Sequence, residues 1–170
     1  MTQVAIRRAR PGDAATLSEL GRATFTQAFG ARYRREDLEA FLDQAYAPRR
    51  IDAFLAEDAF AAWLAEADGE PVGHALAGPC RLPHPEVTAA CGELKRLYVL
   101  SGWRGGLGSR LAQTALEWLE RDGPRRIWIG VWSRNAAAQR FYRRLGFEQV
   151  GQYHFEVGAT RDDEFILRRG

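Results

Sequence analysis

The sequence predicts a mixed α/β domain in which a sheet of six or seven strands is flanked by helices. Three observations indicate this class. Apolar residues recur at helical spacing near the N-terminus, an Asp-Gly pair separates two apolar runs near residue 68, and a continuous apolar run at 127–132 follows an amphipathic helix. These features describe one antiparallel half and one strand–helix–strand crossover. No repeat, linker or low-complexity block interrupts the chain, so we expect a single domain over residues 1–170.

The first half of the chain predicts strands separated by a block of helices. A strand at 4–8 is followed by the turn Pro11-Gly12-Asp13, after which Leu17 and Leu20 begin the apolar face of a helix that reaches Ala28. Asp13 is the expected cap of that helix. The remaining expected elements are helices at 35–46 and 48–56, strands at 60–66 and 71–77 joined by the Asp-Gly turn, and a proline-containing loop at 78–90.

The second half predicts the crossover and a final antiparallel pair. The run at 127–132 is apolar throughout, as expected of a strand covered on both faces. The expected elements are a strand at 93–100, helices at 105–121 and 135–145 on either side of the 127–132 strand, and final strands at about 149–155 and 164–168.

Composition excludes several classes of function. The 170 residues are 46% hydrophobic and carry a formal net charge of +2, and Lys95 is the one lysine among scattered arginines. The sequence has no basic run of the kind that binds nucleic acid and no apolar run long enough to span a membrane. We also expect no export signal. We expect a cytoplasmic protein with no nucleic-acid, membrane or metal partner, in which Cys80 and Cys91 are free thiols.

A glycine-rich turn after the 93–100 strand predicts an anion site. Gly105, Gly106 and Gly108 leave backbone N–H groups uncovered at the start of a helix, where the helix dipole also favours a pyrophosphate, and Arg104 adds a positive charge. A dinucleotide fingerprint would need a third glycine where Leu111 stands, and a P-loop would need a lysine. On this segment alone, a plain strand-to-helix turn remains an alternative.

A second motif makes the interpretation specific. Residues 135–147 read Asn-x-x-Ala-x-x-Phe-Tyr-x-x-x-Gly-Phe directly after the buried 127–132 strand. Together with the glycine turn one strand–helix unit earlier, this segment resembles the paired acetyl-CoA motifs of the GNAT superfamily of N-acetyltransferases, here over residues 93–147. The resemblance implies the GNAT fold, acetyl-CoA as cosubstrate and an N-acetyltransferase activity, with residues 12–56 shaping the acceptor site.

The likeness is greatest to the bacterial spermidine/spermine N-acetyltransferase branch. Gly-Leu-Gly-Ser at 106–109, Ile-Trp-Ile-Gly-Val-Trp at 127–132 and Ala-Thr-Phe-Thr-Gln-Ala-Phe at 23–29 carry it. One departure concerns the glycine turn, which usually begins with Gln or Arg. Trp103 stands at that position and Arg104 is shifted by one residue, which puts cofactor affinity in doubt.

The resemblance implies direct attack of a neutral amine on the thioester, without a covalent enzyme intermediate. Tyr142 is then the candidate acid for the departing thiolate, because a phenol with a pKa near 10 can protonate a thiolate. Helical packing alone is the alternative for Tyr142, which lies on an apolar stripe with Phe141 and Leu145.

Glu93 is the candidate base, acting directly or through water. It begins the strand whose later residues should run beside the pantetheine, and in the family this strand carries a bulge that frees N–H groups. Strand alternation puts Glu93, Lys95, Leu97 and Val99 on one face unless the bulge intervenes. A solvated strand end and an anchor for a cationic substrate are the alternatives for Glu93.

The resemblance also implies a set of cofactor-binding positions, and no metal ligand. Asn135 belongs to this set, although capping the last helix would by itself explain it. The expected cofactor-binding residues are Leu97, Tyr98, Val99, Arg104, Gly105, Gly106, Leu107, Gly108, Ser109 and Asn135.

The acceptor is predicted only as a small-molecule amine, with a polyamine as first interpretation. Acidic and aromatic side chains in the expected acceptor segment would suit a polyamine, although a solvated helix face explains them equally. These side chains are Tyr33, Glu36, Asp37, Glu39, Asp43 and Tyr46. The alternatives are a peptide or protein amine, an aminoglycoside, an amino acid, a non-catalytic acyl-CoA-binding module and a pure interaction domain. Monomer and homodimer are both compatible with the sequence.

Overall fold

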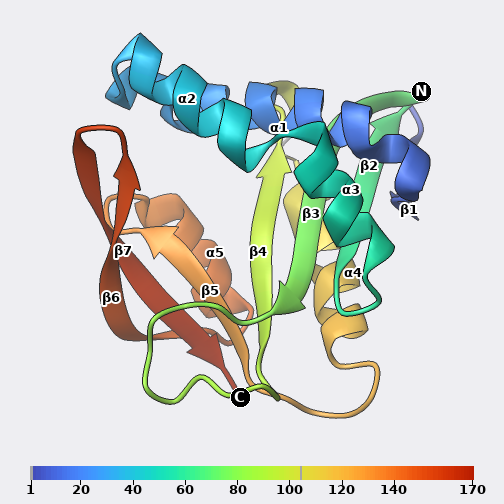
Figure 1. Cartoon of the computed structure of the whole chain (residues 1–170). Coiled ribbons are helices and arrows are strands. Elements are labelled where there is room, and N and C mark those ends of the chain that lie inside the picture. The colour runs from blue at the N-terminus through green and yellow to red at the C-terminus, as the bar shows by residue number, and fades with distance from the viewer. Residues whose placement is uncertain (1, 104) are drawn as a thin grey trace.

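The computed structural model describes residues 2–103 and 105–170. A seven-stranded mixed sheet of order β1-β2-β3-β4-β5-β7-β6 forms the centre (Figure 1). The strands are β1 (Val4–Arg8), β2 (Ala61–Ala67), β3 (Glu70–Pro79), β4 (Gly92–Val99), β5 (Ile127–Trp132), β6 (Glu148–Val157) and β7 (Thr160–Arg169). The helices are α1 (Ala14–Phe29), α2 (Arg35–Ala45), α3 (Pro48–Ala56), α4 (Leu107–Leu119) and α5 (Ala136–Arg144). The predicted fold class is confirmed.

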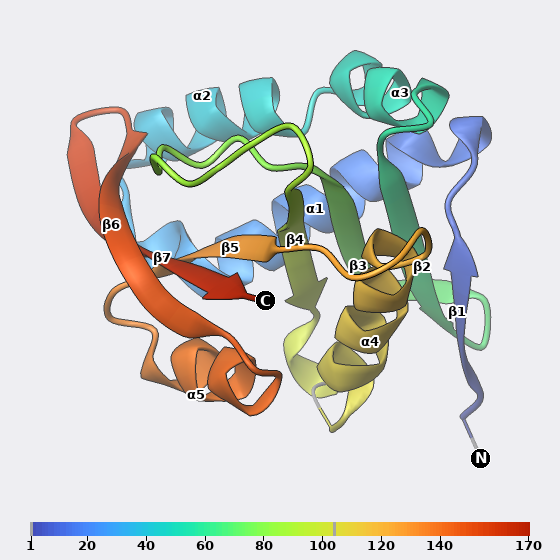
Figure 2. The same cartoon turned by 90° about the horizontal axis from the view of Figure 1, so that it is seen from below.

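Helices cover both faces of this sheet because successive strand residues point to opposite faces (Figure 2). In β2, Trp63 and Ala65 belong to the core beneath α4, whereas Ala62 and Leu64 belong to the core beneath α1 and α3. The α4 side also holds Leu111 and other fully buried side chains. Within the described ranges, no helix is long and apolar enough to cross a membrane.

The two halves of the sheet meet at β4 and β5, and these strands part almost at once. Their parallel pairing covers only Gly92 with Ile127 and Glu93 with Trp128. Beyond these pairs the strands diverge, as Figure 1 shows between the yellow-green β4 and the orange β5. The sheet therefore opens into a V between its antiparallel halves.

A β-bulge in β4 lies beside this opening. Leu76 of β3 pairs with Arg96 and Ala77 pairs with Leu94, so Lys95 has no partner residue in β3. The extra residue breaks the expected alternation. Leu97 contacts the α4-side core together with Leu94, whereas Tyr98 packs on the α1 side with Phe29.

The final hairpin is longer than the sequence predicts. β6 and β7 pair from Glu148–Arg168 to Val157–Thr160, and Gly158 turns the chain with φ +54°. The expected connection between residues 155 and 164 is therefore mostly strand. The hairpin reaches α2, where the rings of Phe41 and Phe155 meet edge to face at 5.5 Å. This contact closes the open side of the V.

Asp13 has a different role from the predicted cap of α1. It ends a short 3-10 turn, and its carboxylate makes no capping hydrogen bond to α1. Both carboxylate oxygens instead accept from the Arg7 guanidinium at 2.9 Å, and Oδ2 also accepts from the Arg10 amide at 2.7 Å.

Candidate active site

A cavity of about 400 Å³ occupies the V between β4 and β5. It receives residues from both faces of the sheet, because the parted strands leave a passage between them. Its wall combines aromatic rings with a few charged groups. Residues on the wall include Phe25, Phe29, Tyr33, Phe41, Tyr46, Arg50, Lys95, Arg96, Leu97, Tyr98, Trp132, Asn135, Tyr142, Tyr153, Phe155, Asp162 and Glu164.

Tyr142 reaches the cavity from α5. Asn135 begins this helix, and its Oδ1 accepts from the Ala138 amide at 3.1 Å, so the predicted capping role is present. The Tyr142 ring packs edge to face against Phe141 and Phe147. Its buried position raises the pKa of the phenol above its usual value of 10, so the neutral, proton-bearing form prevails at physiological pH.

Glu93 lies outside the wall of the cavity. Its Oε1 accepts from the Arg81 amide and from Lys95 Nζ, both at 2.9 Å, and its side chain is 11% exposed. These contacts hold the carboxylate against the loop before β4. Lys95 is among the residues that line the cavity, whereas Glu93 is not.

Two carboxylates, Asp162 and Glu164, line the cavity, and the sequence-based reasoning singled out neither. Glu164 lies on β7, opposite Trp132 of β5 and Tyr153 of β6. Its Oε2 atom is buried and has no hydrogen-bond partner among the described residues. Desolvation, and secondarily the charge of Asp162, raise the pKa of Glu164 from 4.5 to about 7. A carboxylate with this pKa exchanges protons near neutral pH.

Asp162, two residues earlier on the same face of β7, is already paired. Its carboxylate contacts the Arg32 guanidinium and accepts from the Tyr33 hydroxyl at 2.7 Å. Arg32 also stacks over the Trp132 ring at 3.9 Å. Asp162 therefore ties the segment after α1 to the sheet, and Glu164 is left as the carboxylate available to a ligand.

The aromatic residue Tyr98 links the two titrating groups. Burial chiefly raises its pKa, and the Tyr142 phenol and the Glu164 carboxylate contribute to the same rise. Tyr98, Tyr142 and Glu164 all line the same cavity. The cavity thus holds a phenol that burial keeps neutral and a carboxyl group whose pKa is raised to about 7.

The glycine turn lies beyond the cavity, at the start of α4. Gly106 precedes the helix with φ +87°, a conformation that other residues adopt only with strain. A β-carbon at Gly105, Gly106 or Gly108 would meet no atom within 4 Å, so the surface there is open to close approach by a ligand. Arg104 lies outside the described residues.

The other expected cofactor positions divide between the cavity and the core. Leu97, Tyr98 and Asn135 line the cavity. Val99 packs against the α4-side core, and the Leu107 side chain is buried in it, so Leu107 has only its backbone to offer a ligand. Ser109 is in the first turn of α4. Trp103, at the departure from the usual turn, also packs against this core.

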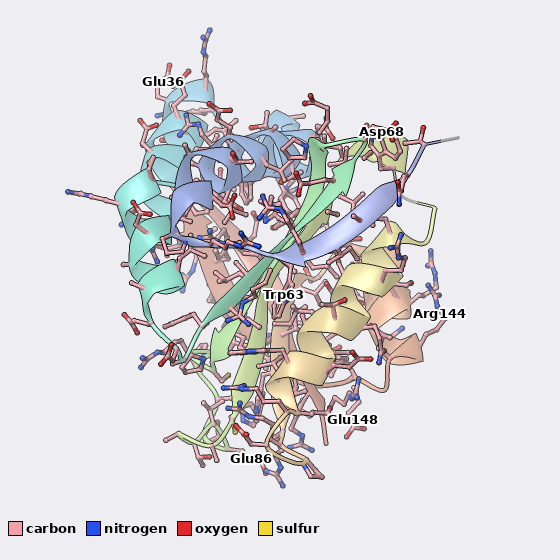
Figure 3. All side chains as sticks on the ribbon, turned by 90° about the vertical axis from the view of Figure 1, so that its right-hand side faces the viewer. Glu36, Trp63, Asp68, Glu86, Arg144 and Glu148 are labelled. Carbon is pink, nitrogen blue, oxygen red and sulfur yellow. The ribbon has the colours of Figure 1, made fainter. Side chains whose placement is uncertain are left out.

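The expected acceptor segment contributes aromatic rings rather than acids. Tyr33 and Tyr46 line the cavity. Three of its carboxylates instead pair with surface arginines, as Arg34–Asp37, Arg35–Glu39 and Arg22–Asp43. The fourth, Glu36, stands at the exposed end of α2 (Figure 3).

Comparison with known proteins shows the family. Residues 22–147 match the acetyltransferase (GNAT) family. An uncharacterized N-acetyltransferase of Mycobacterium bovis is 30% identical over 162 residues, covering 92% of this chain and 97% of the relative. Another, from Lactobacillus delbrueckii subsp. lactis, is 26% identical over 170 residues, covering 99% and 98%. The chain therefore belongs to the GNAT family, which confirms the expectation of an acetyl-CoA-dependent N-acetyltransferase.

Solved structures confirm the fold. The PaiA N-acetyltransferase of Thermoplasma acidophilum, solved in complex with coenzyme A, superposes with a TM-score of 0.79 at 20% identity, and 98% of each chain is covered.

Proposed function

We propose that the protein transfers the acetyl group of acetyl-CoA to a small primary amine by direct attack, with both substrates bound in the V between β4 and β5. One observation carries the proposal. A single cavity holds the neutral phenol of Tyr142 and the unpartnered carboxylate of Glu164, which come from opposite faces of the sheet.

The residues present fit coenzyme A. Diverging strands leave β4 without a sheet partner on its β5 side after Glu93, so backbone groups there are free to bind pantetheine amides. The open glycine turn with Gly106 at the N-terminus of α4 suits a pyrophosphate. When bound, acetyl-CoA supplies an activated acyl group. The bulge at Lys95 exposes amides that can donate to the acetyl carbonyl oxygen.

Glu164 takes the proton that the ammonium form of the acceptor must lose before it can attack. A base with a pKa of about 7 is largely ionised at slightly alkaline pH and still basic enough to accept a proton. Glu93, the residue expected from the resemblance, is held by Lys95 and Arg81 outside the cavity wall. We therefore assign the role of the base to Glu164. We assign to Glu93 the role of positioning Lys95.

Tyr142 gives its proton to the departing sulfur. Burial keeps the phenol protonated throughout the physiological range, so the acid is present at every turnover. The attacking nitrogen loses a second proton as the tetrahedral intermediate collapses to the amide, and this proton returns to the Tyr142 oxygen. After product release, the proton held by Glu164 passes to solvent. Direct transfer requires no other nucleophile from the protein.

We expect a small acceptor because the cavity must also hold the acetyl end of acetyl-CoA. A polyamine acceptor is supported by Glu164 and by the rings of Phe41, Phe155 and Trp132, which can contact a cation. Arg50 and Arg96, which also line the cavity, are unfavourable for a second ammonium group, and an acceptor that carries an anion besides its amine is compatible with Glu164 and with the arginines.

Release of free CoA tests the proposal. Purified protein is given acetyl-CoA and, in turn, spermidine, amino acids, a peptide amine and an aminoglycoside, and acetylated amine is identified by mass. Thiol release that depends on one class of amine is the expected result. Acetyl-CoA binding without release for any amine would replace the enzyme by a non-catalytic acyl-CoA-binding module.

A further inference from the structure

Two arginines line the cavity at a distance along the sheet from Glu164. Arg96 extends from β4 and Arg50 from α3, whereas Glu164 belongs to β7, on the far side of β5. The cavity consequently has one positive and one negative end.

Packing brings the two arginines together. The Arg96 guanidinium carbon is 4.4 Å from the Tyr46 ring centre and 6.0 Å from that of Phe54. The Arg50 guanidinium carbon is 5.8 Å from the same Phe54 ring centre. Both guanidinium groups therefore lie near the Phe54 ring, and both arginines also line the cavity.

These arginines have no counter-charge. Among residues 2–103 and 105–170, no carboxylate lies within 4.0 Å of either guanidinium group. The nearest partner of Arg96 is the carbonyl oxygen of Ala45, at 2.8 Å from Nη2. Lys95, the third cation on the wall, is already neutralised by Glu93 at 2.9 Å.

Burial of Arg96 makes its charge unfavourable without a ligand. Desolvation is the main cause that lowers the pKa of Arg96, Tyr46 and Tyr98 act against it, and the charge of Arg50 adds a smaller decrease. A partly buried cation is stabilised by an anion, and a guanidinium group binds carboxylate and phosphate oxygens in a bidentate geometry. The structure thus provides an anion subsite facing the same cavity as the base.

We propose that the acceptor is a small primary amine that also carries a carboxylate or phosphate group, with its amine at Glu164 and its anion at Arg50 and Arg96. The inference rests on the proposed acetyl transfer and names its substrate class. A polyamine would place a second ammonium group beside two arginines, and like charges at close range repel.

Matched amine pairs test the inference, because each pair differs by the anion. 6-Aminohexanoate is compared with hexylamine, and 6-aminohexyl phosphate with 6-aminohexanol, as acceptors in the CoA-release assay, because a linear chain separates the amine from the anion in these compounds. We expect the anion-bearing member of at least one pair to have a kcat/KM at least tenfold higher. The aminohexanoate pair reports a carboxylate ligand and the aminohexyl phosphate pair a phosphate ligand.

The variants Arg96→Gln and Arg50→Gln should each reduce that preference at least fivefold. Arg50 is exposed at the mouth of the cavity, so its replacement leaves the fold intact. Arg49→Gln is the matched control, since Arg49 is an exposed neighbour on α3 that does not line the cavity, and it should keep the preference.

Calorimetry separates the failure of the inference from that of the proposed function. Binding of 6-aminohexanoate or 6-aminohexyl phosphate to the CoA complex, weakened by Arg96→Gln, supports the anion subsite even where turnover is absent. Preferred turnover of hexylamine, 6-aminohexanol or spermidine would overturn the inference and leave the acetyl transfer standing. Absence of binding by both anionic amines would also overturn it.

Discussion

Replacing Glu164 with Gln should make the protein more stable at alkaline pH while it abolishes most of the activity. The carboxylate is partly buried, and its Oε2 has no partner among the described residues. Its pKa is raised from 4.5 to about 7. Because the raised value disfavours the charged form, folding with an ionised Glu164 costs free energy.

The sign and size of this cost follow from the two pKa values. Below pH 4.5 the group is protonated in the folded and unfolded states alike, so no cost arises. Above pH 7 it is ionised in both states, and the folded state bears the whole cost, at most about 3 kcal/mol. Glu164→Gln removes an ionisable group, so its stability advantage over the parent should grow by about 3 kcal/mol between pH 4 and pH 8.

Urea denaturation at these two pH values measures the difference. Glu70→Gln is the matched control, because Glu70 is exposed at the start of β3, and its effect should stay within about 0.5 kcal/mol at both pH values. In the same preparations, Glu164→Gln should lower kcat/KM about 100-fold or more. It should also remove the inflection near pH 7 from the pH dependence of kcat/KM. An unchanged inflection, or a stability difference independent of pH, would refute the reasoning.

Four further substitutions test other parts of the site and fold. Tyr142→Phe should reduce kcat more than tenfold in steady-state assays while calorimetry finds acetyl-CoA affinity within about twofold, and equal turnover would exclude the phenol as the acid. Gly106→Ala should cost about 1 kcal/mol because its φ is +87°, whereas Gly108→Ala, inside α4, should not destabilise the fold but should weaken acetyl-CoA binding. Asp13→Asn should cost about 1–2 kcal/mol at pH 7, because contact with Arg7 lowers the pKa of Asp13 from 3.8 to about 2. That stabilisation is present above pH 4 and should disappear as the pH falls through 2 in acid denaturation.

The fold was predictable because its signals are local. Helical periodicity, the Asp-Gly hairpin and the buried run at 127–132 each depend on neighbouring residues, and the elements they predict are present. The ends of the last hairpin were not predictable in this way. Asp162 and Asp163 resemble a polar turn ahead of the strand expected at 164–168, and only pairing with β6 makes them strand.

This local ambiguity helps to explain why Glu164 is not among the site residues expected from the sequence. Glu164 is the expected first residue of the last strand, where a carboxylate would be solvated, and nothing in the sequence reveals that it lines the same cavity as Tyr142. The role of Glu93 depended on strand alternation, which the bulge at Lys95 changes. The glycine turn and Tyr142 were identified because each belongs to a contiguous motif. The arginine pair joins α3 to β4, a contact that sequence spacing does not encode.

A crystal structure of the protein with CoA and the best acceptor from the amine panel tests the central claim most directly. We predict that the acceptor nitrogen lies within hydrogen-bonding reach of Glu164, about 3 Å directly or through one water molecule, and that the CoA sulfur lies beside the Tyr142 hydroxyl. A nitrogen held by Glu93, or a CoA thiol outside the V between β4 and β5, would contradict the account.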